Sequence, residues 1–117
     1  MSDGSEIRRG DVVIVRLDPA EGHELKKTRP AVVVQNDTGN KNASTTIVAP
    51  ATGAHRGYPF EVFVEADSSP LTKDSSVRLD QLRVVSIEKR IHSVVGRLDT
   101  ETMAAVDDAL TLSLGLD

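Results

Sequence analysis

The sequence predicts a mainly β fold, either a β-sandwich or a small β-barrel, followed by one C-terminal α-helix. Short runs rich in β-branched residues recur along most of the chain, and Gly, Pro, Asn and Asp separate them. That spacing is typical of small all-β domains. After residue 99 the apolar residues recur every three or four positions, which indicates an amphipathic helix.

The composition favours one globular domain. Of the 117 residues, 38% are hydrophobic and 27% are charged, which suits a single buried core. We expect one domain over residues 1–117, with residues 1–6 flexible because they are mostly small and polar. The chain has no cysteine, which excludes disulfides and fits a reducing compartment. Its apolar runs are far shorter than the roughly 20 residues of a membrane helix, and its start lacks a signal-peptide core. We therefore expect a cytoplasmic protein without membrane contact.

The first two strands are bounded by proline. Residues 12–17 form the first expected strand, which ends where Asp18 favours a turn and Pro19 cannot donate a ladder hydrogen bond. The second begins at Pro30, where a missing N–H does least harm, and continues through residues 31–35.

The middle of the chain alternates loops and strands. Residues 36–44 are rich in turn formers and are expected to form a loop. Residues 45–50 and 60–64 read as short strands, and residues 75–87 offer two strand segments in succession.

The C-terminal helix is expected near residues 100–114. Its apolar stripe consists of Met103, Val106, Leu110 and Leu114. Asp99 or Thr100 can cap its start, and Gly115 can end it.

The order of several motifs resembles one known family. The segments are RGDVVIVRLDP, GHE, KKTRPAVVVQND, TTIVAPAT, GYPFEV and SSVRLDQLRVV, followed by the terminal helix. Together, from Arg9 to the C-terminus, they resemble the PemK/MazF (Kid) family of toxin–antitoxin toxins. The resemblance implies an SH3-like β-barrel of the Kid/CcdB type, a homodimer, and a metal-independent endoribonuclease that cuts single-stranded RNA at short specific sequences. It also implies a cognate, MazE-like antitoxin with a flexible acidic tail.

The resemblance also implies the catalytic positions. By motif they fall on Arg29, Thr52, His23, Glu24, Arg78 and Asp80. Cutting RNA without a metal uses the neighbouring 2′-OH as nucleophile, so the site needs a proton acceptor and cationic donors for the phosphate. The guanidinium of Arg29 suits the phosphate, and the hydroxyl of Thr52 can add a neutral donor. Arg78 is assigned to transition-state charge, since it stays protonated. Which of Asp80, Glu24 and His23 accepts the proton is left open.

A negatively charged chain needs a local basic patch to hold RNA, because the formal net charge is −4. The residues expected to contact RNA are Lys26, Lys27, Arg56, Tyr58, Gln81 and Arg83. His55 and His92 are interpreted as ordinary surface residues, and the histidines lack zinc-ligand spacing. We therefore expect no metal and no cofactor.

Two other functions are compatible with the same fold class. One is a small barrel that binds a protein or RNA partner without catalysis, which the acidic charge and the 3% aromatic content favour. The other is a relative of the gyrase poisons, which share the fold. Those act through a C-terminal Trp-Gly-Ile, whereas this chain has no tryptophan and ends Gly-Leu-Asp.

Overall fold

The computed structural model describes residues 6–116, and seven strands and a C-terminal helix dominate that part of the chain. The strands are β1 (Asp11–Arg16), β2 (Thr28–Val33), β3 (Thr45–Thr52), β4 (Glu61–Val64), β5 (Ser75–Arg78), β6 (Arg83–Ser86) and β7 (Ile91–Arg97). The helices are α1 (Asp37–Asn42), α2 (Ile87–Arg90), α3 (Thr100–Leu114) and the 3-10 turn η2 (Ala66–Ser68).

The strands form one antiparallel sheet in the order β4-β5-β3-β2-β1-β7. β3 is its centre, because β2 pairs along one edge while β6 and β5 pair with successive parts of the other edge. The mainly β fold class is therefore confirmed. The sheet is not a closed barrel, because β4 and β7 lie at opposite ends of it and do not pair within residues 6–116.

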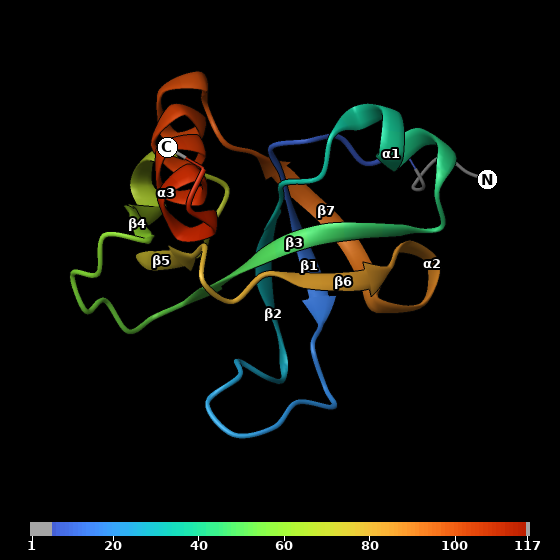
Figure 1. Ribbon diagram of the computed structural model, residues 1–117, viewed down its shortest axis with the longest axis horizontal. Helices are drawn as coiled ribbons and strands as arrows, with labels where there is room; N and C mark the ends of the chain where they lie inside the picture. Colours follow the sequence, from blue (N-terminus) through green and yellow to red (C-terminus); the bar gives the residue numbers. More distant parts are fainter. Residues whose placement is uncertain (1–5, 117) are drawn as a thin grey trace.

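Two apolar clusters fill opposite sides of the sheet. The first, which includes Val32, Ala49 and Val77, packs against Val106 and Ala109 of α3. The second, which contains Val13, Val15, Ala31, Val33 and Val48, lies on the other side of β1, β2 and β3. Figure 1 shows α3 (red) lying beside β4 and β5. The helix α3 therefore covers only one face of the sheet at β4 and β5.

The helix α3 confirms the expected bounds. The side chain of Asp99 accepts a hydrogen bond from the backbone N–H of Thr102 at 2.7 Å, and Gly115 ends the helix with a left-handed φ of 71°. Val106 is buried, whereas Leu114 is 53% exposed, so the end of the apolar stripe extends past the sheet.

Four elements were not anticipated: α1, η2, α2 and β7. Residues 36–44 contain α1 where a loop was expected; it begins at Asn36, whose side chain accepts from the Gly39 N–H at 2.7 Å. The side chain of Asn40 is buried and donates to the Gln35 carbonyl at 3.0 Å. The strand β7 was also missed.

The expected flexibility of residues 1–6 falls, except for Glu6, outside the described residues. Within residues 6–116, every helix is too short or too polar to span a membrane.

Candidate functional site

One face of the sheet around β3 carries three of the six predicted catalytic residues. Ala31 pairs with Pro50, Thr52 with Ser76, and Glu61 with Arg78. Directly paired residues, and residues two apart on a strand, point to the same side of a sheet. One side of the sheet therefore carries, in a row across four strands, Arg29, Thr52, Ser76, Arg78 and Glu61, and we call this row the outer face. Ser76 and the Glu61 side chain are buried within it.

The alternation of the β5 sequence explains why this face is polar. In Ser75–Arg78 and the following Leu79, the apolar Val77 and Leu79 are fully buried in the cluster beneath α3. Their neighbours Ser76 and Arg78 must point the other way. The same strand thus secures the helix with one set of side chains and presents polar groups with the other.

Arg29 lies at the start of β2 with its guanidinium held by backbone oxygens. Its Nε donates to the Lys26 carbonyl at 2.8 Å, and its Nη1 donates to the Ala51 carbonyl at 3.2 Å. Within residues 6–116 no carboxylate forms an ion pair with it. The guanidinium is therefore positioned while its charge remains available to an anion.

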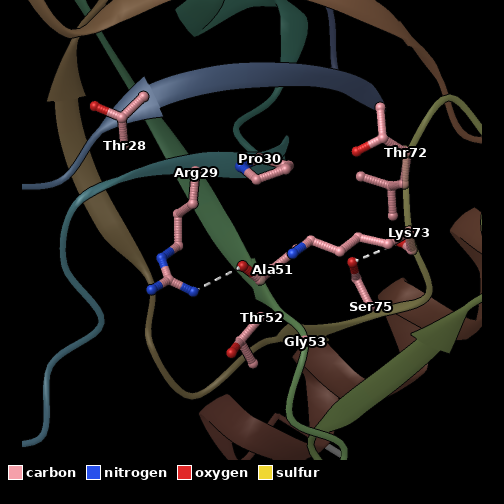
Figure 2. Close-up of a pocket in the computed structure, with 10 residues that line it drawn as sticks. Thr28, Arg29, Pro30, Ala51, Thr52, Gly53, Thr72, Lys73 and Ser75 are labelled. Atoms are coloured by element: carbon pink, nitrogen blue, oxygen red, sulfur yellow. Dashed lines mark hydrogen bonds between the residues drawn. The ribbon is translucent and has the colours of Figure 1, made fainter.

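A pocket of about 260 Å³ adjoins Arg29 and Thr52. Its lining comes from the start of β2, the end of β3 and the connection before β5: Thr28, Arg29, Pro30, Ala51, Thr52, Gly53, Leu71, Thr72, Lys73 and Ser75. Figure 2 shows the side chain of Lys73 reaching across toward Ala51. Sequence reasoning did not select Lys73, because only the folded β4–β5 connection brings it to this pocket.

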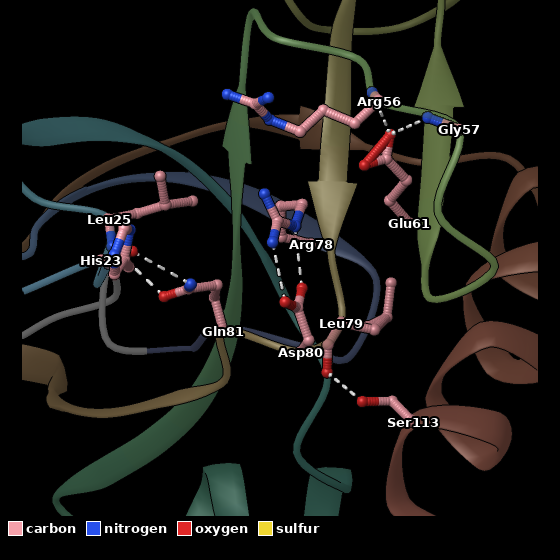
Figure 3. Close-up of polar contacts among 10 residues, drawn as sticks. All are labelled: His23, Leu25, Arg56, Gly57, Glu61, Arg78, Leu79, Asp80, Gln81 and Ser113. Carbon is pink, nitrogen blue, oxygen red and sulfur yellow. Dashed lines mark hydrogen bonds and ion pairs between the residues drawn. The ribbon is translucent and has the colours of Figure 1, made fainter.

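Arg78 and Asp80 form a closed, bidentate ion pair. The Nε and Nη2 of Arg78 donate to the two carboxylate oxygens of Asp80 at 2.8 and 2.7 Å (Figure 3). The hydrogen bond with Asp80 raises the pKa of Arg78 above its already high value, so this guanidinium stays charged. Its Cζ lies 5.3 Å from the ring centre of Tyr58 and 5.8 Å from that of Phe60, within the range of cation–π attraction.

The loop between β1 and β2 carries four predicted residues and is tied to the end of β5. The Gln81 amide donates to the His23 carbonyl and accepts from the Leu25 N–H, both at 3.2 Å (Figure 3). Gln81 directly follows Asp80, so these two hydrogen bonds connect the loop to the segment that carries Arg78 and Asp80. Glu24 accepts from the Glu21 N–H at 2.8 Å.

The remaining predicted RNA contacts have different roles in the structure. Lys26 and Lys27 are exposed on the same loop, and Arg56 is exposed between β3 and β4. Tyr58 is 40% exposed and stacks on Phe60 with ring centres 4.9 Å apart. Arg83 instead donates to the Leu17 carbonyl at 2.9 Å, which braces the backbone.

His55, interpreted from the sequence as an ordinary surface residue, belongs to a cluster at the outer face. Its Nδ1 lies 2.8 Å from Oε2 of Glu61 and 2.6 Å from Oγ of Ser76. Its ring also contacts Phe63 edge-on, with centres 5.1 Å apart. The sequence signal was weak because these partners come together only through strand pairing.

The structure therefore groups the predicted residues into three neighbouring sets. Arg29 and Thr52 share a pocket, Arg78 and Asp80 form an ion pair, and the His23 loop is tied to that pair through Gln81. Within residues 6–116, no three His, Asp or Glu side chains are arranged to hold a metal ion. The arrangement offers two positioned guanidiniums and a hydroxyl, groups that suit a phosphodiester.

Comparison with known proteins gives a consistent picture. The family model described as PemK-like, MazF-like toxin of type II toxin–antitoxin system matches residues 8–114. The crystal structure of MazF from Deinococcus radiodurans superposes with a TM-score of 0.82 at 26% identity, covering 94% of this chain and 97% of that chain.

Two mycobacterial structures share the fold at lower identity. The Mycobacterium tuberculosis toxin MazF-mt6 has a TM-score of 0.78 at 24% identity, covering 92% of this chain and 98% of that one. An endoribonuclease in complex with its cognate antitoxin, from a mycobacterial species, has a TM-score of 0.79 at 23% identity, covering 95% and 97%.

Proposed function

Because the chain belongs to the PemK-like, MazF-like toxin family of type II toxin–antitoxin systems, we propose that it is a metal-independent endoribonuclease that cuts single-stranded RNA. Two of the proteins that share its fold are named endoribonucleases. The observation that carries the proposal is the outer face, where Arg29, Thr52 and Arg78 present phosphate-binding groups on a surface that α3 leaves uncovered.

In the proposed reaction, the 2′-oxygen attacks the adjacent phosphorus and the bond from phosphorus to the 5′-oxygen breaks. Arg29 and Arg78 stabilise the negative charge that develops on the phosphate oxygens, and Thr52 adds a neutral donor. The products are a 2′,3′-cyclic phosphate, or the 3′-phosphate after hydrolysis, and a 5′-hydroxyl.

The proton acceptor for the 2′-OH comes from Glu24, Asp80 or His23. Asp80 has both oxygens engaged by Arg78, which favours a positioning role for it. The loop that carries His23 and Glu24 is exposed and tied to Gln81. Both side chains therefore lie at the surface, with one Glu24 oxygen already accepting from the Glu21 N–H. Lys26, Lys27, Arg56, Tyr58 and Lys73 would contact neighbouring nucleotides.

The proposed partners follow from the cationic side chains on and beside the outer face. A protein of this fold is solved in complex with its cognate antitoxin, and we propose that this chain, as a homodimer in the cytoplasm, is restrained by an antitoxin with an acidic tail. Carboxylates of that tail would take the place of RNA phosphates at Arg29 and Lys73. Antitoxin and RNA would then compete for one surface.

The test of the function is a cleavage assay with long RNA in the presence of EDTA. Mapping of the fragment ends should give 5′-hydroxyls and cyclic or 3′-phosphates. A substrate with a 2′-deoxy residue at the mapped site should resist cleavage, because it lacks the nucleophile. Cleavage of the deoxy site, or none in EDTA with recovery on adding a divalent ion, would contradict the proposal.

A further inference from the structure

A buried carboxylate with no role in the mechanism above lies under the outer face. The side chain of Glu61 has 0% exposure. Its Oε2 accepts from the N–H groups of Arg56 at 2.9 Å and Gly57 at 3.2 Å, and from His55. Its Oε1 is buried and has no hydrogen-bond partner within residues 6–116. Two backbone N–H donors converge on one oxygen, the pattern of an accepting carboxylate, and a buried carboxylate oxygen without a partner is costly.

The Glu61 carboxylate fixes the protonation of the His55 ring. An ionised carboxylate only accepts hydrogen bonds, so the Nδ1 that lies 2.8 Å from it must carry a proton. The Nε2 atom then faces away from Glu61, and within the described residues it forms no hydrogen bond. The His55 side chain is 45% exposed, so Nε2 is open to a ligand. This geometry makes Nε2 the nitrogen that can exchange a proton with a ligand.

The imidazole lies beside the groups proposed to hold the phosphate. Its Nδ1 is 2.6 Å from the Ser76 hydroxyl, and Ser76 pairs directly with Thr52 across β3 and β5. Side chains of such pairs have Cβ atoms about 4.5–5.5 Å apart. The Ser76 side chain therefore lies between the His55 ring and Thr52.

We propose that His55, held by Glu61, donates the proton that the 5′-oxygen needs as it leaves. This assignment rests on the proposed function. As the 2′-oxygen bonds to phosphorus, its proton passes to one of the candidate acceptors Glu24, Asp80 or His23. As the bond from phosphorus to the 5′-oxygen breaks, Nε2 of the imidazolium gives its proton to that oxygen. The product is a 5′-hydroxyl and a neutral His55, which solvent protonates again.

The experiment compares two RNA oligonucleotides that contain the mapped cut site. One has the natural 5′-bridging oxygen, and the other has sulfur in its place, which leaves as a thiolate without needing a proton. His55→Gln should cut the oxygen substrate about 10²-fold or more slowly than the parent chain, yet cut the sulfur substrate at close to the parent rate. Glu61→Gln should show a smaller loss with the same rescue.

Two further variants serve as controls. Arg29→Ala should be slow on both substrates, because charge stabilisation is needed whichever atom leaves. His92→Gln, at an exposed histidine of β7, should match the parent on both. Thermal unfolding of each variant, measured beside the assay, shows that the compared chains are folded at the assay temperature.

Three outcomes would overturn the assignment. Equal slowing of His55→Gln on both substrates would mean that His55 only orders the loop, and full activity on the oxygen substrate would mean that it has no part. In both cases the parent chain and Arg29→Ala still behave as the proposed function requires. A parent chain that cuts neither substrate overturns the proposed function, and the assignment with it.

Discussion

The two faces of the sheet at β3, β4 and β5 differ in what covers them. On one face, Val77 and its apolar neighbours are buried against α3. On the outer face, Ser76 and Arg78 alternate with those residues; Ser76 is buried beside His55, and Arg78 contacts Asp80 and the ring of Tyr58. Because a strand directs successive side chains to opposite sides, one short segment packs the core with one set of side chains and carries polar groups with the other. Substitutions one position apart should therefore have effects of different kinds.

The largest effect is expected at the outer face from Arg29→Ala. Loss of one positioned donor for transition-state charge lowers the rate of RNA cleavage by about 10²–10³, while the unfolding temperature stays close to that of the parent. Rates from an RNA cleavage assay and thermal unfolding curves measure both quantities. Arg8→Ala removes the same charge from an exposed position and should leave the rate unchanged; a folded, fully active Arg29→Ala would place the phosphate elsewhere.

The covered face should give the opposite result with Val77→Ala. Removing two buried methyl groups costs about 2 kcal/mol of unfolding free energy, from lost burial and the cavity left behind. Denaturant unfolding measures this loss. Activity per folded molecule should be retained. If activity per folded molecule falls as far as it does in Arg29→Ala, the two faces are not functionally separate.

A smaller effect, with opposite signs for binding and cleavage, is expected from Asp80→Asn. The change removes a negative charge beside Arg78 and weakens the contacts that hold its guanidinium. RNA should bind more tightly, while cleavage slows by roughly tenfold, equivalent to about 1.4 kcal/mol in the barrier. Binding of an uncleavable 2′-deoxy analogue and single-turnover rates separate the two effects.

The matched control is Asp108→Asn, which makes the same charge change at an exposed position of α3. It should alter neither quantity. A loss of cleavage as complete as that of Arg29→Ala would instead identify Asp80 as the proton acceptor.

The smallest effect is expected at the start of α3, where the cap depends on pH. Hydrogen bonds from Thr102 hold the pKa of Asp99 below its ordinary value of 3.8. A lowered pKa in the folded state adds stability above the unfolded value, and this stability is lost as the pH falls through the folded value. The difference in unfolding temperature between the parent and Asp99→Ala should be present at neutral pH and shrink below about pH 4. A difference that grows in acid would contradict this origin.

Local signals in the sequence were sufficient to predict α3 and most of the strands. Asp99 and Gly115 act within one turn of the helix ends, so the bounds could be read from neighbouring residues. The helix α1 escaped notice because contacts between Asn40 and Gln35, rather than helix propensity, stabilise it. The strand β7 contains Val94 and Val95, both 44% exposed, and so lacks the alternation of a half-buried strand.

The sequence could suggest the motif residues of the candidate site but not the side chains that lie beside them. The row from Arg29 to Arg78 depends on the register of three strands, β2, β3 and β5, and no local pattern specifies that register. Lys73 and His55 come to the site from loops, whose paths follow from the packing of the strands on either side. Local sequence shows that these side chains can bind or transfer protons, but not which groups they meet.

The ion pair between Arg78 and Asp80 also affects how RNA binding should respond to salt. For single strands, each phosphate that a free cation neutralises contributes about 0.7 to the slope of log K against log salt, through release of condensed counterions. Arg78 already has a carboxylate 2.7 Å away as its own fixed counterion. A phosphate that approaches Arg78 shares the guanidinium with the Asp80 carboxylate, so its binding there releases few condensed counterions. The slope should therefore report Arg29, Lys73 and the loop lysines, and it should be shallower than a count of the basic residues along the outer face suggests.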